Sequence, residues 1–365
     1  MSKFVKLSEV ADLTVGFVGT MAEHYETSGI PFLRSLNIKP FFIDNTDIKY
    51  ISESFNNKLS KSILHTDDVV IVRTGLPGTC CVVPKQYDGC NCSDVVIVRP
   101  DKNKVDPHYL AAYINVWGQR QIHNNRVGAV QKHFNVHSAE ELLILLPDIE
   151  TQRKTAAFIK NLNGLILNNN QINDNLQQMA YFTYMHLFYG KKCNGKLGDI
   201  LFENPKSTIQ VGEAKDKSGD YPFFTSGDAV LRWTEPIVEG RNTFLNTGGN
   251  ADVKFYVGAT AYSTDTWCIT AKDDMEDYLY MLLSSIKQEL NLKFFQGTGL
   301  KHLQKPLLKE KAIYIPSRDE ISAFNADIKP WLTMVSENKR ESHRLTALRD
   351  WLLPMLMNGQ ATISD

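Results

Sequence analysis

The sequence predicts an α+β fold: two tandem, repeated α/β domains, each followed by a long helix, with the two helices pairing as an antiparallel coiled coil. Three observations predict it. The chain has 365 residues, enough for about two domains with separate cores. A set of short sequence segments occurs twice in the same order. Two stretches, each of about forty residues, carry apolar side chains at helical spacing.

The composition indicates a folded protein, but the net charge does not indicate a particular class of binding partner. Hydrophobic residues make up 43% and charged residues 22% of the chain, which excludes disordered and fibrous proteins. Lys and Arg number 40 against 41 Asp and Glu, so the chain lacks the basic excess of many nucleic-acid-binding proteins. No apolar run reaches the roughly 20 residues of a membrane helix, and we expect a cytoplasmic protein with no membrane contact.

The internal repeat indicates two related domains. Segment 128–135 matches 297–304, and the same offset relates Tyr109 to Tyr278. The opening segments 6–10 and 196–200 match at a larger offset, and Gly75 pairs with Gly248 between these regions. A drifting offset is what insertions in surface loops produce. Chance similarity is the alternative, but the shared order of the segments favours duplication and a pseudo-two-fold molecule.

Each repeat has the same order of elements. Strand-like segments broken by glycines come first, as at 68–73, 91–98 and 254–257. A short helix follows, at 107–114 or at 277–283. A long helix closes each repeat. The predicted limits are a first domain at 1–148, a long helix at 149–190, a second domain at 191–316 and a second long helix at 317–365.

The two long helices carry apolar stripes with alternating steps of four and three residues, the heptad spacing of a coiled coil. Each would be about 60 Å long, too long for the core of one small domain, so we expect each to pair with the other. Asn169 and Asn338 fall at equivalent places, where a buried Asn would fix the register; alternatively, both face solvent beside the interface. The predicted interface consists of Leu162, Leu165, Asn169, Ile172, Leu176, Met179, Trp331, Val335, Asn338, Leu345, Leu348 and Leu352.

Four of the six cysteines cluster in the first repeat, at Cys80, Cys81, Cys90 and Cys92. Their spacing fits no common zinc motif, and Cys81 and Cys92 lie in strand-like runs where a free cysteine packs as a small apolar residue. Packing is favoured over a zinc site, which stays the open alternative. We find no P-loop, nucleophile elbow, zinc-protease motif or EF-hand loop. The sequence therefore favours a binding protein over an enzyme.

Several segments together resemble a known family, the specificity (S) subunits of type I restriction–modification systems, over essentially the whole chain. The second repeat departs at Ile321, where the first has the family-like Gln152. The resemblance rests on segments 6–10 and 196–200, 68–75, 128–135 and 297–304, 146–152 and 315–321, and 351–360.

The resemblance implies a non-catalytic subunit that recognises a bipartite, asymmetric double-stranded DNA target, one part per recognition domain. Two domains on a rigid coiled coil would fix the spacing of the half-sites. The partners it implies are two methyltransferase subunits and the restriction/translocase subunits. S-adenosylmethionine, ATP and Mg²⁺ would belong to those partners, with no cofactor bound by this chain.

The matched loops and the turns beside glycines are the candidates for DNA contacts, because they carry donors suited to phosphates or base edges. The alternative for each is a solvated charge or a hydrogen bond that stabilises its own loop. Arg34, Arg232 and Arg241 are weaker candidates. The candidates are Arg73, Thr74, Arg126, Gln131, Lys132 and His133 in the first repeat, and Asn246, Thr247, Gln296, Thr298, Lys301 and His302 in the second.

Two other functions fit the same features. A recognition subunit of a type II-like system would differ only in its partner proteins. A duplicated coiled-coil scaffold that joins two proteins would bind no DNA. The bases recognised and the length of the gap do not follow from the sequence, because DNA shape and deformability contribute to recognition.

Overall fold

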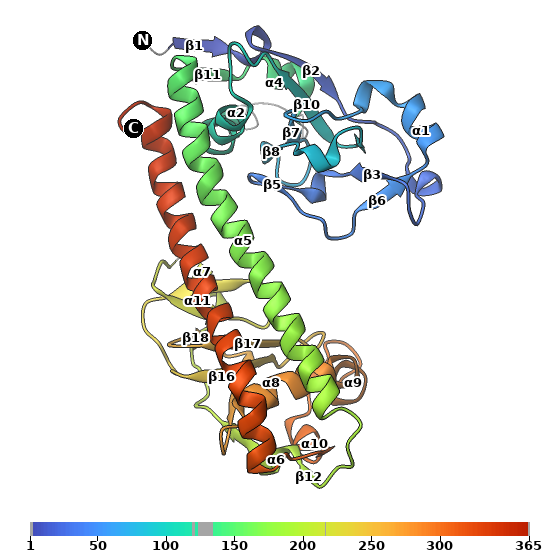
Figure 1. Cartoon of the computed structure of the whole chain (residues 1–365), viewed down its shortest axis with the longest axis vertical. Coiled ribbons are helices and arrows are strands. Elements are labelled where there is room, and N and C mark those ends of the chain that lie inside the picture. The colour runs from blue at the N-terminus through green and yellow to red at the C-terminus, as the bar shows by residue number, and fades with distance from the viewer. Residues whose placement is uncertain (1–2, 119–120, 123–133, 216, 364–365) are drawn as a thin grey trace. The chain divides into compact units, whose positions relative to one another are not determined.

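The computed structural model describes residues 3–118, 121–122, 134–215 and 217–363 and divides into two compact units (Figure 1). Unit 1 comprises residues 1–166 and 343–365, and unit 2 comprises residues 167–342. The long helices α5 (Ile149–Leu187) and α11 (Arg318–Met357) each contribute to both units. The predicted limits at 148, 190 and 316 lie near helix ends, whereas the compact units divide within the helices.

Unit 1 is built on a four-stranded antiparallel sheet with the order β2-β10-β7-β8. Its central strands are runs of Val and Ile that are buried on both faces, which explains their continuous rather than alternating apolar pattern. The strands are β2 (Ala11–Val15), β10 (Val95–Pro100), β7 (Val69–Val72) and β8 (Cys80–Val82).

Smaller elements complete unit 1. A three-stranded sheet has the order β6-β3-β9, and β1 pairs with β11 ahead of α5. The strands are β3 (Ile30–Leu33), β6 (Lys49–Ile51), β9 (Asn91–Cys92), β4 (Ile38–Lys39), β5 (Phe42–Ile43), β1 (Lys3–Lys6) and β11 (Leu143–Leu146). The short helices are α1 (Glu53–Lys58), α2 (Pro107–Tyr113) and α4 (Val136–Glu140).

Unit 2 repeats this topology, with a four-stranded sheet β13-β19-β16-β17, a three-stranded sheet β15-β14-β18 and the pair β12-β22. The strands are β13 (Leu201–Glu203), β19 (Thr266–Ala271), β16 (Arg241–Asn246), β17 (Val253–Val257), β14 (Tyr221–Phe224), β15 (Val230–Trp233), β18 (Ala261–Tyr262), β12 (Gly195–Lys196), β22 (Ala312–Ile313), β20 (Phe295–Gln296) and β21 (His302–Leu303). The short helices are α6 (Leu197–Ile200), α7 (Val211–Lys215), α8 (Glu276–Ser285), α9 (Lys287–Glu289) and α10 (Lys305–Lys309).

Matched hydrogen bonds confirm the sequence repeat. The Tyr109 hydroxyl donates to the Leu145 carbonyl at 2.8 Å, and its counterpart in the second repeat, the Tyr278 hydroxyl, donates to the Tyr314 carbonyl. The donor residues and the acceptor residues of the two bonds are thus separated by the same number of positions in the sequence. Both tyrosine side chains are fully buried. A buried hydroxyl needs such a partner, so this bond fixes the short helix against the strand that precedes the long helix.

The opening segments also have the same role in both units. Their leucines, Leu7 and Leu197, are fully buried. The acidic residue two positions later caps the segment, since the Lys6 N–H donates to Glu9 at 2.9 Å and the Lys196 N–H donates to Asp199 at 2.7 Å. A backbone N–H at a helix start needs such an acceptor, which explains the shared spacing of Lys, Leu and acid.

The long helices pair antiparallel within each unit (Figure 1). In unit 1 the Arg349 guanidinium donates to Asn163 at 2.8 Å. In unit 2 the Asn169 amide donates to Glu341 at 2.8 Å, and the Asn338 amide donates to Asn173 at 2.9 Å. Residues later in α5 therefore pair with residues earlier in α11, as expected for antiparallel helices.

The predicted register of the helix interface is wrong in part. Leu165, Met179 and Leu348 are exposed by 51%, 47% and 42%. Asn173 and Ala180 on α5 are buried instead, because Asn173 faces α11 and Ala180 packs into the core of unit 2. Of the other predicted positions, Leu162, Asn169 and Val335 are buried, and Ile172, Leu176, Trp331, Asn338, Leu345 and Leu352 are half-buried.

Both asparagines that we singled out lie at the helix interface, where each pairs with a different residue of the other helix. Asn169 is 8% exposed and pairs with Glu341, whereas Asn338 is half-buried and pairs with Asn173. Amide and carboxylate groups in a seam of this kind require specific partners, so they oppose slippage of one helix along the other.

The four clustered cysteines lie in packed cores. Cys80 and Cys81 are consecutive on β8, so their side chains point to opposite faces and enter different apolar clusters. Burial raises the pKa of the Cys80 and Cys81 thiols and raises that of Cys90 to about 12. Within the described residues, no group of three or more His, Cys, Asp or Glu is placed to hold a metal ion.

No helix in the described part of the chain is both long enough and apolar enough to span a membrane.

Candidate nucleic-acid interface

In unit 2, two of the segments predicted to contact DNA lie side by side. The Gly249 N–H donates to the Lys301 carbonyl at 2.9 Å, and the Leu303 N–H donates to the Thr247 carbonyl at 2.9 Å. The end of β16 and the 297–304 segment are distant in the chain but are joined by these backbone hydrogen bonds. The β20–β21 pairing holds this segment as a hairpin, with Gln296 opposite His302.

Unit 1 has the same junction. The Phe134 N–H donates to the Arg73 carbonyl at 3.3 Å, as Leu303 does to Thr247, and Phe134 and Leu303 hold matched positions in the repeat. The Arg73 N–H donates to the Asp94 carbonyl at 3.2 Å, and the Thr247 N–H donates to the Asp265 carbonyl at 3.0 Å. Arg73 and Thr247 are therefore structural equivalents. Arg126, Gln131, Lys132 and His133, which we also predicted to contact DNA, lie outside the described residues.

The equivalence corrects one detail of the sequence alignment. Gly75 and Gly249 each lie two positions beyond the matched residues, and both have a φ of 82°. Gly75 therefore corresponds to Gly249 and not to Gly248. A left-handed conformation favours glycine, which explains why both turns have it.

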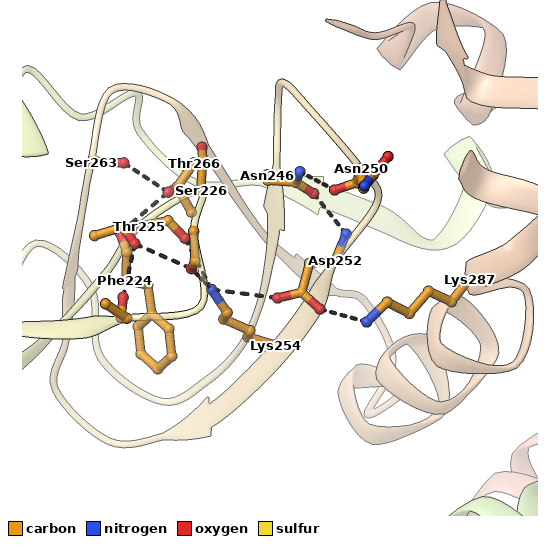
Figure 2. A network of polar contacts seen from close by, with 12 residues as sticks. Phe224, Thr225, Ser226, Asn246, Asn250, Asp252, Lys254, Ser263, Thr266 and Lys287 are labelled. Carbon is orange, nitrogen blue, oxygen red and sulfur yellow. Dashed lines mark hydrogen bonds and ion pairs between the residues drawn. The ribbon is translucent and has the colours of Figure 1, made fainter. Parts of the chain in front are cut away.

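A polar network joins two turns of unit 2 (Figure 2). The Lys254 ammonium donates to the Thr225 carbonyl at 3.1 Å and also to the Gly227 carbonyl, and it lies 3.4 Å from Asp252. Lys287 pairs with the other oxygen of Asp252 at 2.7 Å. Burial alone would raise the pKa of Asp252, but the two ammonium groups hold that pKa below its usual range. The network thus keeps Asp252 ionised and holds the 225–229 turn against β17.

Asn246, which we predicted to contact DNA, is part of this network, and its side chain is buried and engaged within the turn. It is 4% exposed, and its amide donates to the Gly248 carbonyl at 2.6 Å and to the Asn250 carbonyl. Its side-chain oxygen accepts from the Asp252 N–H at 2.7 Å. With donor and acceptor both engaged, the side chain stabilises its own turn, which was the alternative weighed for every candidate.

The side chains of the other described candidates are exposed or half-buried. Gln296, Thr298, Lys301 and His302 are exposed, and the Gln296 amide donates to the Lys293 carbonyl at 3.1 Å. The Thr247 hydroxyl donates to the Asp265 carbonyl at 3.0 Å. Arg73 and Thr74 are half-buried, and the Arg73 guanidinium donates to the Phe134 carbonyl at 3.2 Å.

All three weaker candidates donate to backbone carbonyls, and Arg241 also pairs with a buried acid. Arg34 donates to the Asp47 carbonyl and carboxylate, and Arg232 donates to the carbonyls of Gly219 and Asp220. Arg241 lies beside the fully buried Asp277, with 2.8 Å between its guanidinium and a carboxylate oxygen. Arg241 is therefore not available to DNA.

Sequence reasoning missed four exposed residues at these junctions. Asp94 and Asp265 are equivalent and exposed beside Arg73 and Thr247. Leu76 is 76% exposed in the β7–β8 turn, and Asn250 is exposed in the β16–β17 turn. The matched glycine that precedes Leu76 and Asn250 is the signal that finds these two residues.

The exposed groups of each junction can bind but form no evident catalytic set among the residues that the structure describes. Lysine and histidine side chains are suited to phosphates, and carboxylate and amide groups are suited to base edges. Backbone hydrogen bonds hold both junctions in place, which limits the ordering cost of binding.

Three findings relate this chain to known proteins. A family model described as "Type I restriction modification DNA specificity domain" matches residues 2–178 and 191–339. The "Type I restriction enzyme EcoDI specificity subunit" of Escherichia coli is 22% identical over 171 residues, 42% of this chain and 38% of that protein. The crystal structure of the type I restriction–modification S subunit from M. genitalium has a TM-score of 0.64 and 13% identity, covering 100% of this chain and 97% of that one.

The two matched ranges of the family model coincide with the two copies of the repeat, and the solved structure shows the same fold. The stretch matched in the curated relative spans well under half of that protein's length. The chain belongs to the type I restriction modification DNA specificity domain family.

Proposed function

We propose that this chain is the DNA-recognition subunit of a type I restriction–modification enzyme and binds a bipartite, asymmetric double-stranded DNA target. The observation that carries the proposal is the pair of equivalent junctions, Arg73 with Phe134 and Thr247 with Leu303, which share backbone hydrogen bonds but carry different exposed side chains. Two similar surfaces with different chemistry suit two different half-sites. Membership of the family supports the same assignment.

In this proposal the chain itself is not an enzyme. It directs two methyltransferase subunits and the restriction/translocase subunits to the target, and S-adenosylmethionine, ATP and Mg²⁺ act on those subunits. The chain supplies contacts to phosphates and base edges, from residues such as Lys301 and His302. A complex of this kind acts on cellular DNA, so we place it in the cytoplasm.

Methylome sequencing tests the proposal. A host that lacks other methylation systems expresses the chain together with its methyltransferase, and a second culture expresses the methyltransferase alone. We expect a methylated motif of two specific parts separated by unspecified bases, present only when both proteins are expressed. A motif that forms without this chain, or no motif at all, contradicts the proposal. If the chain binds its methyltransferase but the complex protects no DNA in a footprinting assay, a protein scaffold would be favoured instead.

A further inference from the structure

The β7–β8 turn of unit 1 and the β16–β17 turn of unit 2 present one equivalent residue each. Their strands end in matched hydrogen bonds, and Gly75 and Gly249 share a φ of 82°. The residues that follow, Leu76 and Asn250, therefore occupy the same place in the two repeats. One is apolar and the other is an amide, although the backbone up to the preceding glycine is matched.

Leu76 is exposed in a turn whose backbone is well held. The Gly78 N–H donates to the Val72 carbonyl at 3.1 Å, and the Thr79 N–H donates to the Leu76 carbonyl at 3.2 Å. The side chain is nevertheless 76% exposed and adds little to the core. A fixed backbone with an unburied apolar side chain leaves that side chain available to a ligand.

Asn250 is presented in the same way. Its backbone carbonyl accepts a hydrogen bond from the Asn246 side-chain amide. The side-chain oxygen of Asn246 in turn accepts a hydrogen bond from the Asp252 N–H (Figure 2). The network of Asp252, Lys254 and Lys287 supports this turn. Asn250 itself is exposed, and its side-chain amide makes no hydrogen bond to another residue in the described part of the chain.

We propose that Leu76 and Asn250 are specificity-determining residues for the two half-sites, an inference that rests on the proposed function. Leu76 contacts the C5 methyl group of a thymine in one half-site, because thymine alone presents a methyl group in the major groove. Asn250 binds an adenine in the other half-site, because its amide donor and acceptor match adenine N7 and N6. The neighbouring Lys301, whose carbonyl accepts from Gly249, is suited to an adjacent phosphate.

Base analogues in the target test the two contacts separately. The purified complex of the chain with its methyltransferase is titrated with duplexes that carry the motif found by methylome sequencing. Uracil replaces one thymine at a time and removes only the methyl group. We expect one such change to weaken binding about fourfold, the equivalent of one buried methyl group, and to have no effect on the Leu76→Ala variant.

The Asn250 contact has its own analogue. Replacing one adenine with 7-deazaadenine removes the N7 acceptor, and we expect binding about tenfold weaker, with no effect on Asn250→Ala. The sensitive thymine and the sensitive adenine should lie in different half-sites. Leu143→Ala, at another exposed leucine of unit 1, is the matched control and should keep the wild-type sensitivity to both analogues.

The outcomes separate the inference from the function on which it rests. If the wild-type complex tolerates every uracil and every 7-deazaadenine, or if the Ala variants stay as sensitive as the wild type, Leu76 and Asn250 do not contact these bases. The bipartite motif would then still stand. If methylome sequencing finds no bipartite motif, the proposed function fails, and this inference fails with it.

Discussion

At the scale of single residues, similar side chains beside similar turns have different roles, and burial decides which. Asn246 ends β16 and Asn250 lies in the turn that follows, yet the first is buried with its amide fully engaged and the second is exposed. Arg241 equally looks like a DNA-contact arginine in the sequence. In the fold it lies beside Asp277, whose side chain is fully buried, and also donates to the Thr333 hydroxyl at 2.9 Å.

Replacing Arg241 by Gln should destabilise unit 2 by about 3 kcal/mol at pH 8, because it leaves a buried carboxylate without its cation. Burial already raises the pKa of Asp277 from 3.8 to about 6, although Arg241 opposes the rise. Losing Arg241 raises that pKa further, so the carboxyl is protonated in both proteins in acid. The penalty should therefore shrink below about pH 6 and grow above it.

Urea unfolding of the wild type and R241Q at pH 5 and pH 8 measures this effect. Arg232→Gln is the control, since Arg232 donates to backbone carbonyls and has no buried acid beside it in the part of the chain that the structure describes. A penalty for R241Q that is equal at the two pH values, or larger at pH 5, would show that Asp277 is not the cause.

At the scale of elements, the long helices do more than pair with each other. α5 places Ala156 and Ile159 in the core of unit 1 and Ala180 and Tyr184 in that of unit 2. This explains why the heptad pattern predicted the helices correctly but placed residues such as Leu165 at an interface where they are exposed. A helix that packs on a domain and on a helix has a broader buried face than a simple coiled coil.

The N-terminus of α11 depends on Glu320, and the dependence gives a pH test. Glu320 pairs with Lys191 at 2.6 Å and accepts from the Ser317 N–H at 2.8 Å and from the Tyr314 hydroxyl. Led by Lys191, these donors lower the pKa of Glu320 from 4.5 to about 2. Its contribution to stability is therefore present above about pH 4.5 and is lost as the pH falls toward 2.

Thermal unfolding followed by circular dichroism should show a lower Tm for Glu320→Gln than for the wild type at pH 7. The difference should narrow as the pH falls from 4.5 toward 2, where the wild-type carboxyl becomes protonated as well. Glu310→Gln serves for comparison, because Glu310 forms an exposed pair with Lys196. A Tm difference that stays constant down to pH 2 would exclude ionisation of Glu320 as the source.

At the scale of the whole molecule, duplication produced two units with one topology and different surfaces. The net charge of −1 means that any basic surface of the chain is balanced by acidic groups elsewhere in it. DNA affinity depends strongly on the number of phosphates that are neutralised. A chain without a basic excess therefore suits a subunit whose partners provide part of the DNA contact.

Gel shift assays at physiological salt should accordingly show weak binding by the isolated chain, with a Kd above about 1 µM. Adding the methyltransferase should bring specific binding into the range of about 10 nM. A scrambled duplex of the same length controls for nonspecific binding. Tight, sequence-specific binding by the chain alone would contradict the expectation that its partners complete the interface.

The sequence by itself determined the repeat, the order of the elements and the two long helices, because these depend on local periodicity and on matched segments such as 6–10 and 196–200. Its glycines also marked the junction segments as turns where DNA contacts could be expected. Only the tertiary structure decided which side chains of those segments are free, because the exposure of Leu76 and Asn250 and the burial of Asn246 depend on contacts between distant parts of the chain. It likewise decided the helix register, because the domains compete with the partner helix for the same apolar faces.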